Sequence, residues 1–219
     1  MIQMLKKLIL LTIGASITVA YADSGLYLGV GAGYANQGIS TTNGYSYLDG
    51  SSSQSGGNML GSVYLGYDFN HYLGIQSDYF YMADVQYTIG NNLNNGSQGS
   101  FTASQQLIDL GITGHLPFGI FANSLSGLSI FGKLALGYSF MNFSGGTVGI
   151  NGNSSSTQNI PGSSQGLVPV IGGGLEYGID SAGIRLEYDY IGNTPISNNG
   201  QSLMNANNNV FLLSALYHF

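Results

Sequence analysis

The chain has 219 residues, of which 43% are hydrophobic and only 6% are charged, and it contains no cysteine. The lack of cysteine excludes disulfides and thiolate metal sites. The low charge is unusual for a soluble domain, in which about 25% of residues are charged. All ten carboxylates follow Ala22, and only two cations, Lys133 and Arg185, accompany them, so this part has a net charge of −8. So acidic a chain is a poor partner for nucleic acid or for anionic surfaces.

The first 22 residues have the features of a secretory signal peptide. Two lysines precede an apolar run from Leu8 to Ala20, and Ala20-Tyr21-Ala22 supplies the small residues of a cleavage site. The alternative is an uncleaved membrane anchor, but the run is shorter than the about 20 residues that span a bilayer. We therefore expect residues 1–22 to be removed and residues 23–219 to form a single barrel domain.

Eight segments of alternating apolar and polar residues follow, most of them near the length of a tilted membrane strand, about 9–11 residues. Short links join the second segment to the third and the sixth to the seventh, and a somewhat longer one, Pro117 to Gly127, joins the fourth to the fifth. In chain order the segments are Leu26–Ala35, Met59–Phe69, Leu73–Met82, Gln105–Leu116, Leu128–Phe143, Leu167–Ile179, Ala182–Ile191 and Asn209–Phe219.

The remaining links are long, polar and rich in Ser, Asn and Gly. Long links on one side and short turns on the other are typical of a transmembrane barrel whose short side is periplasmic. A closed barrel is also the only alternative to helices that satisfies every backbone group in lipid. The sequence thus predicts an all-β fold, an eight-stranded antiparallel up-and-down transmembrane β-barrel with both termini periplasmic. The predicted outer loops are Asn36–Asn58, Ala83–Ser104, Ser144–Gly166 and Gly192–Asn208.

The two faces of the predicted strands differ sharply in character. Between residues 184 and 190, Ile, Leu and Tyr alternate with Arg185, Glu187 and Asp189. A soluble β-sandwich would show the same period, but its loops would carry charge, and here only Asp49 and Asp84 do so. Tyrosine and phenylalanine gather near both ends of the strands, as they do at the two membrane interfaces.

The charged residues of the inner face form the candidate site. A lumen of eight strands is just wide enough for its own side chains, so ions inside it must be paired. The turn geometry predicts that Glu176 pairs with Arg185 and allows Asp109 to pair with Lys133. We expect these ions to plug the lumen, although acids in excess of cations could instead line a gate for cations. The predicted luminal charge cluster is Asp78, Asp109, Lys133, Glu176, Arg185 and Glu187.

The segment Asn209–Phe219 ends in an aromatic residue and carries a continuous apolar face. It resembles the C-terminal assembly signal of bacterial outer membrane proteins, with Tyr217 and Phe219 in the recognised positions. Together with Leu26–Tyr34, Gly132–Tyr138 and Ile184–Tyr188, it makes the chain similar to the eight-stranded barrels of the outer membrane protein A and X type and to the neisserial opacity proteins. The resemblance covers the strands but not the loops, and it implies a location in the outer membrane of a Gram-negative bacterium.

The histidines give little support to catalysis. His71, His115 and His218 fall on the predicted periplasmic rim, and a serine nucleophile needs a base beside it, which the outer loops do not provide. We therefore expect neither enzymatic activity nor a cofactor.

The resemblance implies a structural or surface-interaction role, such as adhesion or envelope integrity, carried by the polar loops. The alternative function is a small, passive, cation-preferring channel. The expected partners are outer membrane lipids and lipopolysaccharide, periplasmic chaperones, the barrel assembly machinery and host surface molecules, with no nucleic acid among them.

Overall fold

Alternating side chains produce long strands in the computed structural model, which describes residues 25–41, 52–55, 59–89, 99–144, 147–149, 157–159, 162–198 and 201–219. β-Branched and aromatic residues recur at every second position, where they pack on one face of a sheet. The long strands are β1 (Gly25–Thr41), β3 (Met59–Asn70), β4 (Leu73–Ile89), β5 (Gly99–Pro117), β6 (Leu128–Ser144), β9 (Ser163–Ile179), β10 (Ala182–Asn198) and β11 (Gln201–His218).

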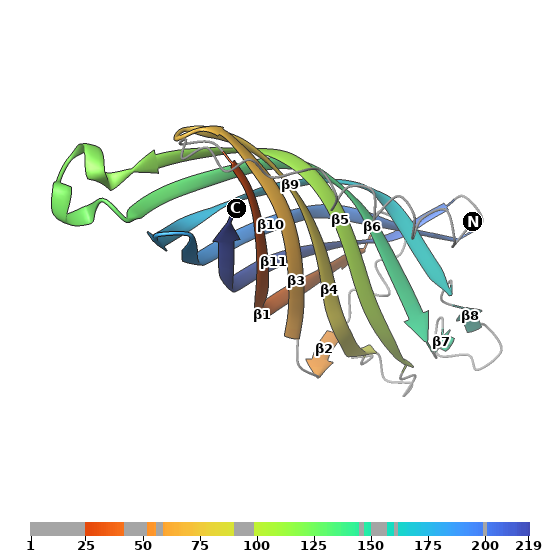
Figure 1. Ribbon diagram of the computed structural model, residues 1–219. Helices are drawn as coiled ribbons and strands as arrows, with labels where there is room; N and C mark the ends of the chain where they lie inside the picture. Colours follow the sequence, from red (N-terminus) through yellow and green to blue (C-terminus); the bar gives the residue numbers. More distant parts are fainter. Residues whose placement is uncertain are drawn as a thin grey trace, which may run out of the picture.

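These eight strands close into a barrel (Figure 1). Each pairs antiparallel with the long strand before and after it in the chain, and β11 pairs with β1 to complete the ring. Closure leaves no sheet edge exposed to lipid. The predicted eight-stranded antiparallel fold is therefore confirmed. Three short strands lie outside the ring: β2 (Ser52–Ser55) pairs with β4, and β7 (Thr147–Gly149) pairs with β8 (Thr157–Asn159).

The outer face of the barrel is a band of large apolar side chains. Leu134, Leu136 and Ile184 each expose more than half of their surface, whereas Lys133 and Arg185 beside them are buried. An apolar patch that surrounds a whole protein is incompatible with water, but it is what a bilayer requires of a barrel wall. The alternation seen in the sequence therefore sorts apolar residues towards lipid and polar ones towards the lumen.

One end of the barrel carries the short turns. Asp180 adopts a left-handed conformation, with φ of 52°, in the tight turn between β9 and β10, as two-residue hairpins require. The link between β5 and β6 contains two single-turn 3-10 helices, η2 (Phe118–Ile120) and η3 (Asn123–Leu125). Phe219 lies at this same end, where its N–H donates to the carbonyl oxygen of Leu26 at 2.9 Å. Short turns identify it as the periplasmic end.

The other end extends further than the sequence predicts. The observed strands match the predicted segments closely at the periplasmic end but run up to eight residues longer at the outer end, as β11 does. The predicted loop Gly192–Asn208 is wrong, because most of it belongs to β10 and β11. This continuation is rich in polar Asn, Ser and Gln residues. It lacks the alternation of apolar and polar residues because a strand outside the membrane has no lipid-facing side. The predicted signal peptide lies outside the described residues. Within them, no helix is long and apolar enough to cross a membrane.

Outside the membrane band the wall divides into two sheets. Pairing between β9 and β10 stops at Val170 and Ile191, although both strands continue. Pro169 lies next to Val170 and Pro195 lies four residues beyond Ile191, and proline has no N–H to donate to a ladder. On the opposite side, pairing between β1 and β3 stops at Tyr34, where β3 begins. The outer part of the wall thus comprises β10–β11–β1 on one side and β9–β6–β5–β4–β2 on the other.

Placing a charge on the outer face tests where the membrane lies. Leu134→Arg puts a guanidinium in the apolar band and should lower the free energy of unfolding by about 2–4 kcal/mol. Asn142→Arg, on an exposed position of the outer extension of the same strand, should change it little. The measurement is reversible denaturant unfolding in lipid vesicles. Equal losses in both variants would contradict this placement of the bilayer.

Candidate functional site: the charged lumen

The inner face of the barrel brings together every residue of the predicted luminal charge cluster. Alternate positions of β4, β5, β6, β9 and β10 point inward and supply the charged side chains. Five of the six, all except Glu176, have at most 2% of their surface exposed. Ions this deeply buried must find partners inside the lumen. The interior is therefore best described by the contacts of its two cations, Arg185 and Lys133.

Arg185 occupies the layer nearer to the periplasm. Its Nε and one terminal nitrogen donate to the same Glu176 oxygen at 2.9 and 2.7 Å, and the other terminal nitrogen donates to Gln76 Oε1 at 2.7 Å. The guanidinium also lies 4.4 Å from the ring centroid of Phe131 and 5.0 Å from that of Tyr64. Arg185 and Glu176 face each other in the register of β9 and β10, which is the pairing that the short turn predicts.

Lys133 occupies the next layer outward. Its ammonium lies 2.9 Å from a carboxylate oxygen of Glu187, 2.9 Å from one of Asp189 and 3.4 Å from one of Asp78. The Phe80 ring centroid is 5.2 Å from the ammonium nitrogen, on the outer side of this layer. Removing this one ammonium would leave three buried carboxylates facing one another, so Lys133 neutralises more charge than any other residue of the lumen.

Gln76 joins the two cation layers, and the sequence analysis did not include it in the cluster. Its amide oxygen accepts hydrogen bonds from Arg185 and from the Tyr27 hydroxyl, both at 2.7 Å. Its amide nitrogen donates to the Asp78 carboxylate at 2.8 and 3.0 Å, and that carboxylate in turn contacts Lys133. The sequence signal was present, because Gln76 lies two residues before Asp78 on the same face of β4. The predicted cluster contains charged residues alone, so the uncharged Gln76 is absent from it.

The expected pair of Asp109 and Lys133 is wrong. In the register of β5 and β6, Lys133 lies opposite Thr113, and Asp109 lies opposite Gly137. The link between these strands is long and contains two 3-10 turns, so counting residues from its middle placed the strands out of register. Asp109 instead faces Asp78 across β4 and β5, and its carboxylate accepts a hydrogen bond of 3.3 Å from the Asp78 backbone N–H.

An apolar layer fills the lumen beyond the charged layers. Phe80, Leu107 and Leu212 belong to a cluster of buried residues drawn from strands all around the barrel. Beyond this cluster, Gln105 accepts hydrogen bonds from the amides of Gln37 and Asn208, each at 2.8 Å, and donates to Ser139 at 2.8 Å. These bonds connect the two sheets of the outer wall. Ions, apolar side chains and amides thus close the lumen in successive layers.

Glycines make room for the aromatic rings of the lumen. A Cβ on Gly29 would overlap the ring of Tyr64, and one on Gly66 would overlap the ring of Tyr27. Each glycine is the register partner of the tyrosine it accommodates. This explains the glycine-rich start of β1 as a packing feature, since a side chain at either position would displace a ring that contacts Arg185.

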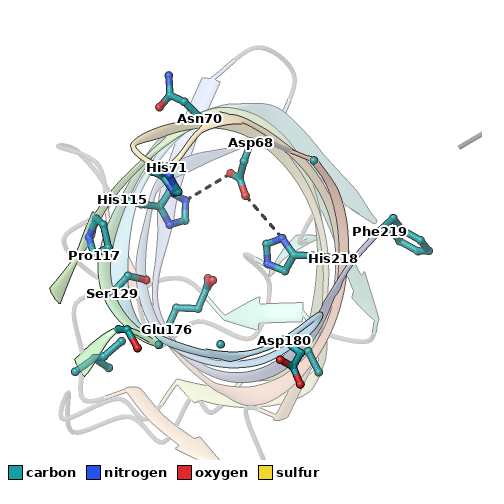
Figure 2. Close-up of a pocket in the computed structure, with 16 residues that line it drawn as sticks. Asp68, Asn70, His71, His115, Pro117, Ser129, Glu176, Asp180, His218 and Phe219 are labelled. Carbon is teal, nitrogen blue, oxygen red and sulfur yellow. Dashed lines mark ion pairs between the residues drawn. The ribbon is translucent and has the colours of Figure 1, made fainter. Parts of the chain in front are cut away.

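The three histidines lie around the periplasmic mouth (Figure 2). Asp68 stands between two of them: one carboxylate oxygen is 3.9 Å from His115 Nε2, and the other is 4.0 Å from His218 Nδ1. Within the described part of the chain, no group of three or more His, Cys, Asp or Glu side chains is arranged to hold a metal ion.

The residues of the predicted assembly signal lie on the outside of the barrel, at the seam between β11 and β1. Tyr217 and Phe219 expose about half of their surfaces and pack edge to face, with ring centroids 5.2 Å apart. Both point towards the lipid at the periplasmic interface, where aromatic residues are enriched. Their recognition by the assembly machinery stays a prediction.

A closed antiparallel barrel with an apolar outer band and a filled polar interior defines a transmembrane β-barrel protein of the outer membrane type. The chain belongs to the outer membrane protein beta-barrel domain family, whose family model matches residues 8–219. It is therefore a protein of the Gram-negative outer membrane. No curated protein sequence matches it.

Solved structures of bacterial barrels are similar to the chain. OprG from Pseudomonas aeruginosa aligns with a TM-score of 0.53 and 15% identity, over 93% of this chain and 99% of OprG. Neisserial surface protein A aligns with a TM-score of 0.45 and 14% identity, over 90% and 99% of the two chains. Ail from Yersinia pestis aligns with a TM-score of 0.44 and 17% identity, over 89% and 99%. At such identities the likeness to OprG shows the fold alone.

Replacing Lys133 tests the role of the ion network. Lys133→Met keeps the length of the side chain but removes its charge, and it should destabilise the barrel by about 3–5 kcal/mol because three carboxylates lose their counterion. Lys133→Ala should cost slightly more, because it also leaves a cavity. The midpoint of denaturant unfolding in detergent measures both effects. An unchanged midpoint for either variant would show that the network does not hold the lumen together.

Proposed function

We propose that this protein is a non-catalytic, non-conducting outer membrane barrel with a structural or surface-interaction role carried by its outer end. The observation that supports this most strongly is the filled lumen. Lys133 and Arg185 are each engaged by carboxylates, and buried apolar residues from all around the barrel close the space beyond them. An ion that crossed this interior would have to break buried pairs and enter an apolar layer, both of which cost several kcal/mol.

The outer extension supports a role at the cell surface. Eight-stranded barrels need only about 9–11 residues per strand to cross the membrane, whereas β9 and β10 have 17 each. The additional residues are rich in Asn, Ser and Gln and lie outside the membrane. The hydrogen bonds of Gln105 to β1, β6 and β11 join the two sheets of the outer wall. Such an extension would hold the polar loops on a rigid support outside the lipopolysaccharide layer. Their composition favours hydrogen bonding to a partner, such as a host surface molecule.

The geometry gives little support to catalysis. In the part of the chain that the structure describes, the three histidines lie at the periplasmic mouth. Two of them contact the carboxylate of Asp68, and this contact does not include a serine. A hydrolase of outer membrane lipids would need its nucleophile and base on the lipid-facing or outer side.

The excess of acids favours a second candidate function, a cation-preferring channel. The described lumen contains six carboxylates, including Asp68 at its mouth, against two cations. If the pairs around Lys133 rearranged, the remaining carboxylates would attract cations into a narrow water path. The closed apolar layer around Leu107, which is fully buried, makes this the weaker of the two candidates.

Single-channel recording separates the two candidates. Protein refolded from detergent, with folding checked by its heat-dependent shift on a gel, should be silent in a planar bilayer. The control is the double variant Glu187→Gln and Asp189→Asn, which alters the luminal charge. Cation-selective steps in the parent protein that lose their selectivity in this variant would establish the channel and overturn the plug. Steps of equal selectivity in both would come from a contaminant.

Replacing an outer loop tests the surface role. Exchanging residues 42–51, between β1 and β2, for a Gly-Ser linker of the same length should leave the barrel folded, because both strands keep their bounds and the link keeps its length. It should reduce the attachment of protein-displaying bacteria to host cells or matrix proteins. Exchanging residues 90–98, between β4 and β5, for a Gly-Ser linker of their own length is the control for a changed outer link. Attachment of both variants equal to that of the parent, or a parent that attaches no better than cells lacking the protein, would leave only the envelope-integrity role.

A further inference from the structure

The periplasmic mouth of the barrel encloses a cavity of about 400 Å³. It lies on the periplasmic side of the Arg185 layer and opens between the short turns. Figure 2 shows Asp68 and Glu176 on opposite sides of the opening, with His115 and His218 placed around it. A volume of this size is within the range of small-molecule sites, about 300–1,000 Å³. Glu176 lines this cavity and also pairs with Arg185, whereas the contacts of Lys133 lie deeper in the lumen.

The charge of the cavity is one-sided. Asp68, Glu176 and Asp180 line it, and no lysine or arginine is found among its described lining residues. The nearest guanidinium, that of Arg185, is already engaged by Glu176 and Gln76. Low-dielectric walls strengthen the electric field of the lining carboxylates and favour a cation in the cavity.

Two buried polar atoms in the cavity have no hydrogen-bond partner. One is Asp68 Oδ1 and the other is His115 Nε2, and 3.9 Å separates them. This is too long for a hydrogen bond. The His115 side chain is nine-tenths buried, with 10% exposed, and it points into the mouth. A group with two donors that lies to one side of the line joining the two atoms could reach both at hydrogen-bond distance, as bridging groups do in wet sites.

The imidazoles are held in place before any ligand arrives. The His115 ring stacks on Phe131, with centroids 5.9 Å apart, and the His218 ring lies 5.3 Å from that of Tyr27. Both aromatic partners also contact Arg185. The mouth is therefore built on the rigid plug, which reduces the entropy that a ligand would lose in ordering it.

We propose that this mouth is a binding site for an organic ammonium ion that enters from the periplasm. An ammonium group has several N–H donors, two of which suit Asp68 Oδ1 and Nε2 of a neutral His115 imidazole. A bare metal ion fits less well, because the acids and histidines do not converge on one point. An anion would face three carboxylates. A polyamine, with two or more ammonium groups on an aliphatic chain, would let a second ammonium approach Glu176 on the opposite side of the opening.

Spermidine is the probe for a direct test. Full-length mature protein in lipid nanodiscs is titrated with spermidine at constant ionic strength, and the imidazole signals of the histidines are followed by NMR. His115 and His218 should shift with saturation, and the same dissociation constant should appear by calorimetry. Magnesium chloride at equal charge is the ionic control. Nα-acetyl-lysine amide serves as a second probe, because its single ammonium group is carried on a peptide-like unit.

Two variants and one control define the outcome. Asp68→Asn should weaken spermidine binding by about tenfold or more, because a charge-assisted bond is lost. Asp84→Asn, an exposed acid on the outer half of β4, should leave binding unchanged. Ser129→Lys places an ammonium beside its register partner Glu176. It should abolish binding while keeping or raising the unfolding midpoint, which distinguishes occupation of the site from misfolding.

Several results would overturn the proposal. These are equal affinity of Asp68→Asn and the parent, equal loss in Asp84→Asn, and histidine shifts that magnesium reproduces at the same charge. Saturation by Nα-acetyl-lysine amide but not by spermidine would assign the site to a peptide-borne ammonium, and the reverse would assign it to a free polyamine. Both of these last results support the ammonium site.

Discussion

The structure depends on one constraint: within lipid, every backbone N–H and C=O must be hydrogen-bonded inside the protein. The chain meets it by closing eight strands through the pairing of β11 with β1. Closure with this number of strands fixes the width of the lumen. Since that width leaves space only for side chains, half of the residues in every strand must pack together in a small interior. The constraint no longer applies outside the membrane. There the ladder between β9 and β10 stops, next to Pro169.

Filling the lumen with ions follows from the same closure. Apolar residues are needed on the lipid side, so the alternate positions carry the polar residues of the chain. Tyr27, Gln76 and Arg185 show how these are satisfied, since one amide oxygen accepts bonds from both a hydroxyl and a guanidinium. Buried ion networks add little net stability compared with apolar packing, but breaking one is costly. Such a network therefore makes a single arrangement of the lumen much more stable than its partly opened alternatives.

The sequence predicts most of what lies inside the membrane and less of what lies outside it. The alternation of apolar and polar residues located the eight strands and their faces, and the two-residue turn at Asp180 was enough to place Glu176 opposite Arg185. The length of the long link between β5 and β6 does not fix which residues of the two strands face each other, so the expected pair of Asp109 and Lys133 was wrong. Gln76 was missed because hydrogen bonds between distant strands depend on register. The outer strand extensions were missed because they lack a lipid-facing side.

The two ends of the barrel are therefore free to differ in function, because the plug separates them. At the outer end, bonds from Gln105 tie together two sheets that no longer form a closed ring. At the periplasmic end, the aromatic residues that contact Arg185 also fix His115 and His218. Arg185 thus closes the lumen and forms the floor of the mouth. A change in the mouth reaches the plug through Glu176, which contacts Arg185 and lines the cavity. The outer surface lies on the far side of the apolar layer around Leu107, which separates the two regions proposed to bind partners.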